Sequence, residues 1–361
     1  MIEVAHGLVG RSDLPIPEWL FGWAAAVVLV VSFVALAVLW PEPKLSRASF
    51  RPLPRLSRVA LSRPVDLVCG LLGVFLLGLT VYAGFEGSQT STANFASVFV
   101  YVIFWIGLVA LSVLLGNVYR AFNPWRALGR TVSWIARTAA RAPMPAPLTY
   151  PERLGHWPAA AGIFLFAALE LAVSDGDAPQ TVAIAALVYS LIQFVGMALY
   201  GVEEWTERGD GFSVYFGLFA RISPWGVRDG VLGVRPPLAA LADFRPLAGT
   251  VALLAVMIGS VTFDGAAEAP LWTGIAPDIS DFLQTLGLTP ERALELTFLV
   301  GLVAAIAIVY GFYMLGVRGA QSVGGGFTAR DLSRAFVASL VPIAFAYVAA
   351  HYLTLLLYNG Q

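Results

Sequence analysis

The chain contains little charge and almost no cysteine. Asp, Glu, Lys and Arg make up 12% of its 361 residues, about half the share found in an ordinary globular domain. Cys69 is its single cysteine, so no disulfide framework, Cys-rich zinc site or iron–sulfur cluster can form within the chain. The net charge of −1 gives no indication of nucleic-acid binding.

Motifs for nucleotide and haem chemistry are also missing. The sequence has no Gly-rich phosphate loop and no G-x-S-x-G elbow, which disfavours ATP-driven chemistry and an ordinary serine hydrolase. A bis-His haem needs two histidines at matching depth, whereas His156 is predicted at an inner edge and His351 near the outer one. The sequence therefore predicts neither haem nor nucleotide. No inverted repeat is evident, which weakens a transporter interpretation.

Long hydrophobic runs dominate what is present. Hydrophobic residues make up 58% of the chain and form eight stretches long enough to cross a bilayer. The stretches cover roughly 19–40, 65–85, 95–118, 156–174, 180–200, 245–263, 295–317 and 335–357. The sequence therefore predicts an all-α polytopic membrane protein, with 1–361 forming a single transmembrane helical domain in the lipid bilayer.

The basic residues are confined to alternate connecting segments. Six Lys and Arg fall in 41–64, six in 119–155, five in 201–245 and three in 318–334. The other connections hold only Arg11 and Arg292. Because short basic loops stay on the cytoplasmic side, both termini are predicted to lie outside the cytoplasmic membrane.

Two loops have helical apolar spacing and are predicted to form short amphipathic helices. In 211–225, Phe212, Tyr215, Phe216, Phe219 and Ile222 recur on one face, which predicts an in-plane or re-entrant helix on the inner side. Ile279, Phe282, Leu283 and Leu286 do the same between Pro277 and Pro290, which predicts a short helix covering the outer mouth.

Both ends of the sequence look abrupt. No basic n-region or apolar h-region precedes residue 19, so either a short tail crosses with the first helix or a leader is missing. The last apolar stretch runs to Tyr358 with almost no polar tail. Truncation at one or both ends is therefore expected.

Ionisable residues within spans are the strongest functional signal, because they are costly in lipid and usually face a bundle interior or a water-filled cavity. Glu170 and His351 fall in the outer third of their stretches, and Asp264 ends the sixth stretch on the same side. His6 and Asp13 lie on the tail that is predicted to emerge there, and Asp175 and Asp177 follow the fourth stretch.

This set predicts an outward-facing pocket. His6, Asp13, Asp264 and His351 are the candidate ligands of a divalent metal (Zn²⁺, Mn²⁺ or Fe²⁺) that would activate water. Glu170, Asp264 and His351 are the candidate catalytic groups. The alternatives are separate hydrogen-bonded or interfacial histidines, and outer acids that remain simply because Lys and Arg are depleted there.

Three further features are interpreted as structural rather than functional. The turn Arg120, Asn123, Pro124, Trp125 and Arg126 could bind an anionic head group, but enforcing topology is the favoured interpretation. Glu203 and Glu204 are expected to pair locally with Arg208. Glycines 70, 73 and 78 of the second stretch either permit close helix packing or reflect the ordinary glycine content of membrane helices.

Several strings resemble bacterial integral-membrane proteins named fenitrothion hydrolase, a membrane organophosphorus hydrolase-like family. These strings are AHGLVGRSDLPIPEWLFGW (5–23), FNPWRALGR (122–130), RGDGFSVYFGLFARISPW (208–225), VTFDG (261–265) and AHYLTLLL (350–357). The resemblance spans nearly the whole chain. It implies a bacterial inner-membrane location and hydrolysis of an aryl phosphorothioate triester, a hydrophobic small-molecule substrate, with release of a nitrophenol. It transfers no catalytic residues.

A non-catalytic component is the alternative. A permease or metal-handling subunit, with or without a partner subunit, could use the same acids and histidines to hold or pass a cation. Chelator-sensitive nitrophenol release distinguishes the two classes.

Overall fold

A computed structural model describes residues 18–39, 44–45, 48–139 and 147–359. Contacts divide the chain into a unit of residues 1–48 and a unit Ser49–Gln361, and each is described by itself. In the first unit, helix α1 spans Glu18–Leu39, where the first hydrophobic stretch predicts a helix.

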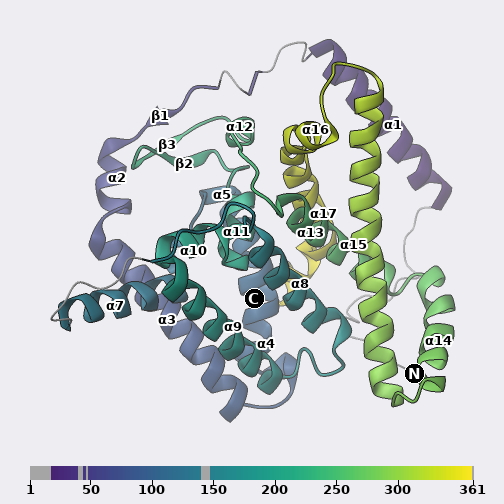
Figure 1. Cartoon of the computed structure of the whole chain (residues 1–361), viewed down its shortest axis with the longest axis horizontal. Coiled ribbons are helices and arrows are strands. Elements are labelled where there is room, and N and C mark those ends of the chain that lie inside the picture. Colours follow the sequence, from purple (N-terminus) through teal and green to yellow (C-terminus); the bar gives the residue numbers. More distant parts are fainter. Residues whose placement is uncertain (1–17, 40–43, 46–47, 140–146, 360–361) are drawn as a thin grey trace. The chain divides into compact units, whose positions relative to one another are not determined.

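Helices make up most of the second unit (Figure 1). The α-helices are α2 (Pro54–Ala60), α3 (Arg63–Glu86), α4 (Phe95–Val98), α5 (Leu108–Leu115), α6 (Tyr119–Phe122), α7 (Pro124–Ala139), α8 (Trp157–Ala172), α9 (Pro179–Tyr200), α10 (Val202–Arg208), α11 (Gly211–Phe219), α12 (Ala239–Ala242), α13 (Thr250–Ala266), α14 (Pro270–Thr285), α15 (Pro290–Ser322), α16 (Ala329–Phe336) and α17 (Leu340–Asn359). Segments η1 (Ser91–Ala93) and η3 (Val337–Ser339) are 3₁₀ turns, and η2 (Phe99–Gly107) is π-helical.

The helices are those of a membrane protein. Five helical segments are long and apolar enough to cross a membrane: α3, the run Phe95–Leu115, α9, α15 and the run Ala329–Leu357. A sixth is obtained if α13 and α14, which are bent by 92°, form one broken span. Shorter apolar helices occupy Gly22–Leu36 and Trp157–Ala172. An apolar helix thus lies at each predicted stretch, while a count of eight spans stays a prediction.

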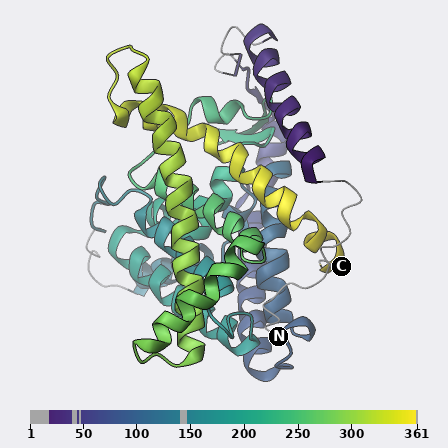
Figure 2. The same ribbon diagram turned by 90° about the vertical axis from the view of Figure 1, so that its right-hand side faces the viewer.

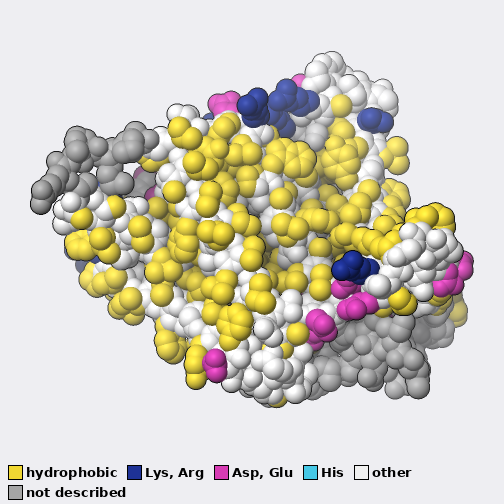
Figure 3. All heavy atoms as spheres, turned by 60° about the horizontal axis from the view of Figure 1, so that its bottom comes forward, with side chains coloured by type: hydrophobic (Ala, Val, Ile, Leu, Met, Phe, Trp, Pro, Cys, Tyr) yellow, Lys and Arg dark blue, Asp and Glu magenta, His cyan; other side chains and the backbone are white. Residues whose placement is uncertain are grey.

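Hydrophobic side chains cover much of the surface. Figure 3 shows a face on which they form a broad area, with most charged side chains near its edges. A soluble domain would bury these side chains, whereas lipid solvates them.

The core of the second unit is aromatic and centres on α11. Tyr215, Phe216 and Phe219 expose at most 1% of their surface. Tyr215 stacks on Trp105 of η2 with ring centres 4.8 Å apart. Residues 211–225 therefore do contain a helix, but its aromatic face packs inside the protein among α5, α8 and α10. An in-plane helix with its aromatic face toward lipid was therefore a wrong prediction, because that face packs against protein, whereas the re-entrant alternative stays a prediction.

The helix predicted in the 264–294 loop is longer than its apolar spacing suggested. α14 begins at Pro270 and contains Pro277 within it, and it packs along α15. Phe282 and Leu286 remain largely exposed. Figure 2 shows α15 (light green) and α17 (yellow) leading away from the α16 connection at the upper left.

A small antiparallel sheet was not predicted. Strands β2 (Trp225–Arg228) and β3 (Val231–Val234) form a hairpin, and β3 also pairs with β1 (Arg51–Pro52). Asp229 and Gly230 turn the hairpin with positive φ angles of 51° and 76°, which is the geometry that Asp-Gly favours.

The four basic segments include parts that meet at one end of the second unit. The sheet joins 51–52 to 231–234, and Arg120 of the second basic segment pairs with Glu203 and Glu207 of the third. Helix α12 of the third segment contacts η3, which begins shortly after the fourth. Elsewhere, Ser97 donates to the Asp177 carbonyl and the Ser174 amide to Glu295, so residues in or next to the connections predicted outside contact one another. These contacts agree with alternate crossing, while the number of spans and the side of each terminus stay predictions.

The side of the membrane that each end faces can be tested by cysteine labelling. With Cys69 replaced by alanine, Asp175→Cys should react with an impermeant maleimide in intact cells, whereas Arg58→Cys should react only after lysis. Both positions are exposed and lie outside the longest apolar helices. Labelling of Arg58→Cys in intact cells would reverse the predicted topology.

Candidate functional site

A polar contact joins α13 to α17. Asp264 lies near the end of α13, and His351 and Tyr352 are adjacent on α17. The Asp264 Oδ2 atom is 2.9 Å from His351 Nε2 and 2.7 Å from the Tyr352 hydroxyl. Asp264 and His351, predicted to converge from depth alone, therefore hydrogen-bond directly.

The contact fixes the tautomer of His351. Because an ionised carboxylate only accepts hydrogen bonds, the Nε2 atom donates its hydrogen to Asp264, and Nδ1 of the neutral ring is left with a lone pair. The imidazole exposes 30% of its surface and the Asp264 side chain 14%. A small molecule or water can thus reach the ring, while the carboxylate that orients it is largely shielded.

Glu170 adds a second carboxylate beside this pair. It lies two residues before the end of α8, a helix that packs against α13 and α15. Its carboxylate interacts electrostatically with Asp264 and with the hydroxyl groups of Tyr101, Tyr215 and Tyr352. Asp264 and His351 are thus in contact, and a place for Glu170 in the same site stays a prediction.

Two buried tyrosines, Tyr352 and Tyr215, also belong to this region, and neither was selected from the sequence. Tyr352 is 4% exposed and donates to Asp264. Tyr215 is 1% exposed, and its hydroxyl has no hydrogen-bond partner among the described residues. A tyrosine next to His351 in an apolar helix, and another in the 208–225 string, were the available signals, because a buried tyrosine normally needs a polar partner.

The predicted metal site is only partly within the described residues. Within these residues, no three His, Cys, Asp or Glu side chains form a group that could hold a metal ion. Two of the four predicted ligands, His351 and Asp264, contact each other. The other two, His6 and Asp13, lie outside the described residues. A metal held by all four therefore stays a prediction.

The inner basic turn serves the fold. Arg126 exposes 10% of its side chain and pairs with Asp66 at 3.0 Å and with Glu203 at 3.1 Å. Burial alone would lower the pKa of Arg126, but the hydrogen bonds and charges of Glu203 and Asp66 outweigh it and raise that pKa. The guanidinium is thus a structural cation that joins α3, α7 and α10. Glu204 pairs with Arg208 at 3.0 Å, as expected, whereas the same expectation for Glu203 was wrong, because Glu203 pairs with Arg120 and Arg126.

His156 is the second described histidine, and it is structural. It is 6% exposed, and its Nδ1 atom is 3.0 Å from the Thr250 hydroxyl. That hydroxyl already donates to the Leu247 carbonyl, so Nδ1 carries the hydrogen. Burial, then the positive charges of Arg221 and Arg208, lower the pKa of His156 from 6.5 to about 4.

The lowered pKa makes stability depend on pH. Between pH 6.5 and pH 4, His156 is protonated in the unfolded chain and neutral in the folded chain. The free energy of unfolding is therefore highest above pH 6.5 and decreases as the pH falls toward 4. We expect this group to remove about 3 kcal/mol over that window. Unfolding in mixed detergent micelles should therefore show a steeper pH dependence for the natural protein than for His156→Gln. Equal slopes would contradict the assignment.

Comparison with known proteins gives no relative. No family model, no curated protein and no solved structure matches the chain.

Proposed function

We propose that this chain is a membrane-embedded hydrolase of uncharged apolar esters, with organophosphorus triesters as the substrate class. The observation that carries the proposal is the Asp264–His351 pair, in which a partly exposed imidazole is oriented by a shielded carboxylate within an apolar bundle. The resemblance of five strings to the fenitrothion hydrolase family supplies the substrate class. A triester of this kind partitions into lipid, where a site between spans can receive it laterally.

The geometry supports a water-activation step. His351 Nδ1 accepts a proton from water, and the resulting hydroxide forms a bond to phosphorus while the bond from phosphorus to the aryl oxygen breaks. The electron pair leaves with the aryloxide, and the proton taken by His351 can return to it. Asp264 stabilises the imidazolium ion. Tyr352 holds Asp264 in position.

The donor atoms also bear on the metal prediction. His351 Nε2 and Asp264 Oδ2 are occupied by each other, so metal binding would use His351 Nδ1 or replace this hydrogen bond. With His6 and Asp13 as further ligands, a bound divalent ion would supply a water of lowered pKa.

The test is release of nitrophenol from fenitrothion by the purified protein in lipid nanodiscs, followed by absorbance. We expect turnover above that of empty nanodiscs, and chelator treatment then measures metal dependence. If purified, folded protein releases no nitrophenol with or without added Zn²⁺, Mn²⁺ or Fe²⁺, the hydrolase proposal fails. The non-catalytic permease or metal-handling subunit would then be favoured.

A further inference from the structure

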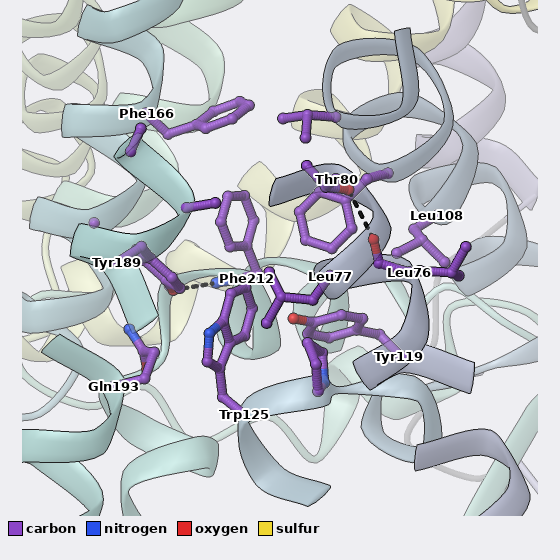
Figure 4. Close-up of a pocket in the computed structure, with 18 of the residues that line it drawn as sticks. Leu76, Leu77, Thr80, Leu108, Tyr119, Trp125, Phe166, Tyr189, Gln193 and Phe212 are labelled. Atoms are coloured by element: carbon purple, nitrogen blue, oxygen red, sulfur yellow. Dashed lines mark hydrogen bonds between the residues drawn. The ribbon is translucent and has the colours of Figure 1, made fainter. Parts of the chain in front are cut away.

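A large apolar cavity lies apart from the Asp264–His351 pair. Its volume is about 820 Å³, within the range of small-molecule sites. Helices α3, α8 and α9 and the segment 99–125 contribute its walls, and Leu76, Leu77, Phe166 and Phe212 are among the side chains that surround it (Figure 4).

The cavity opens toward lipid. Several of its lining side chains are also exposed on the surface of apolar helices: Ile103, Leu111, Leu115, Leu165, Val188 and Ile192. The run Phe95–Leu115 and α9 are long enough to cross a membrane, and α8, which carries Leu165, is a shorter apolar helix. A molecule dissolved in the bilayer can therefore enter from the side without crossing a polar surface.

One polar group points into this apolar space. Tyr119 of α6 is 1% exposed, yet its hydroxyl has no hydrogen-bond partner among the described residues. Figure 4 shows the ring reaching into the cavity with the oxygen directed toward Leu77 and Trp125. An unpaired buried hydroxyl costs free energy that a ligand acceptor would recover.

Several other polar side chains along the wall are already paired, and Tyr119 is the lining residue whose buried hydroxyl has no partner among the described residues. Trp125 donates to Ser190, Trp205 to Gln193 and Tyr189 to Asp210. Tyr119 therefore stands out as the group able to make a new hydrogen bond.

The apolar walls disfavour a charged ligand, and a buried carboxylate whose pKa is raised by burial, Asp210, pairs with Tyr189 of the wall. This carboxylate is 0% exposed and accepts from Tyr189, Asn123 and Ser213 side chains and from two backbone amides. Its charge acts on the Tyr119 hydroxyl. Burial, then this charge, raises the pKa of Tyr119 well above its usual value, so the phenol stays a donor.

The cavity is separated from the Asp264–His351 pair by an aromatic layer. Phe166 lines the cavity and packs on Trp105 with ring centres 4.5 Å apart, and Trp105 in turn stacks on Tyr215 beside Glu170. A ligand here would touch neither His351 nor Asp264.

We propose that this cavity binds an uncharged, lipid-like ester drawn laterally from the bilayer, whose carbonyl or phosphoryl oxygen accepts a hydrogen bond from Tyr119. The apolar walls take the chain or rings, and the single donor selects an acceptor oxygen. The site is independent of the proposed hydrolysis.

The experiment is photo-crosslinking of the full chain in nanodiscs with a diazirine-bearing methyl stearate, followed by peptide mapping. We expect label on α3 and α9, and we expect methyl stearate or triphenyl phosphate to displace it. Whichever of the two competes better shows whether the cavity prefers an aliphatic lipid or an aromatic ester. Octadecane, which has no acceptor, and the stearate anion should compete at least tenfold less well.

Variants test separately the hydrogen bond of Tyr119 and the shape of the cavity. Tyr119→Phe should weaken competition by methyl stearate about tenfold while leaving that by octadecane unchanged. Tyr82→Phe, which alters an exposed tyrosine on α3, is the matched control and should have no effect. Leu77→Trp, which fills the cavity, should abolish the specific label. Equal competition by octadecane, or unchanged competition in Tyr119→Phe, overturns the proposal.

Discussion

Replacing His351 with alanine should lower the rate of nitrophenol release by roughly 10²–10⁴-fold, the range that general-base catalysis supplies. The loss should fall on kcat more than on KM, because the imidazole acts on water rather than on the apolar groups of the substrate. Asp264→Asn should also lower kcat, because the amide removes the charge that stabilises the imidazolium ion. Steady-state kinetics in nanodiscs measure both variants.

A matched tyrosine pair serves as the control. Tyr352→Phe removes the hydroxyl that donates to Asp264 and should reduce kcat by about tenfold, the equivalent of one hydrogen bond. Tyr347→Phe alters a half-exposed tyrosine on the same helix and should leave the rate unchanged. Retention of full activity by His351→Ala, in protein that inserts normally, would remove His351 from the mechanism.

Gly73→Ala should destabilise the protein by about 3 kcal/mol, the upper part of the range for overpacking. A Cβ atom at Gly73 would lie 1.9 Å from the Phe122 carbonyl oxygen and 2.9 Å from its carbon. Backbone atoms cannot rotate away as a flexible side chain can, so α3 and the end of α6 would have to separate. Because Trp125 and Arg126 follow directly, the buried ion pairs at this end would be strained too.

Gly78 provides the internal comparison on the same helix. No atom lies within 4 Å of a Cβ built there, so Gly78→Ala should be neutral or stabilise α3 by up to ~1 kcal/mol through helix propensity. Reversible unfolding in mixed micelles compares the two variants. Similar stability changes at both positions would show that the Phe122 contact does not limit packing.

The helices were largely predictable because hydropathy over a bilayer-length window is a strong local signal. The close-packing interpretation holds at Gly70, which faces Ala127 of α7, and at Gly73, which faces Phe122 of α6, and not at Gly78. The hairpin was missed although Asp229-Gly230 marks it, because a short strand in a basic loop has no long-range pattern. The burial of α11 was missed because the sequence of an aromatic helix shows the same pattern whether its apolar face packs against lipid or against protein.

Depth was enough to find part of the candidate site. Depth alone predicted Asp264, Glu170 and His351, but residues at equal depth on different helices either contact one another or lie far apart. Which of the two occurs depends on the rotation of each helix about its axis, and that rotation is set by packing between residues distant in sequence. Tyr215 and Tyr119 could not be selected for the same reason, because an unpartnered hydroxyl is defined only by what surrounds it.

If the predicted topology is right, the arginines at the end that faces the cytoplasm act at two different times. While the chain is being inserted, Arg120, Arg126 and Arg130 are unpaired charges, and that is the state in which they can retain a loop on the cytoplasmic side. After folding, Arg126 is shielded by Asp66 and Glu203, and its neighbours pair with the same acids. Orientation is thus decided before these pairs exist, and the pairs then make that orientation costly to reverse.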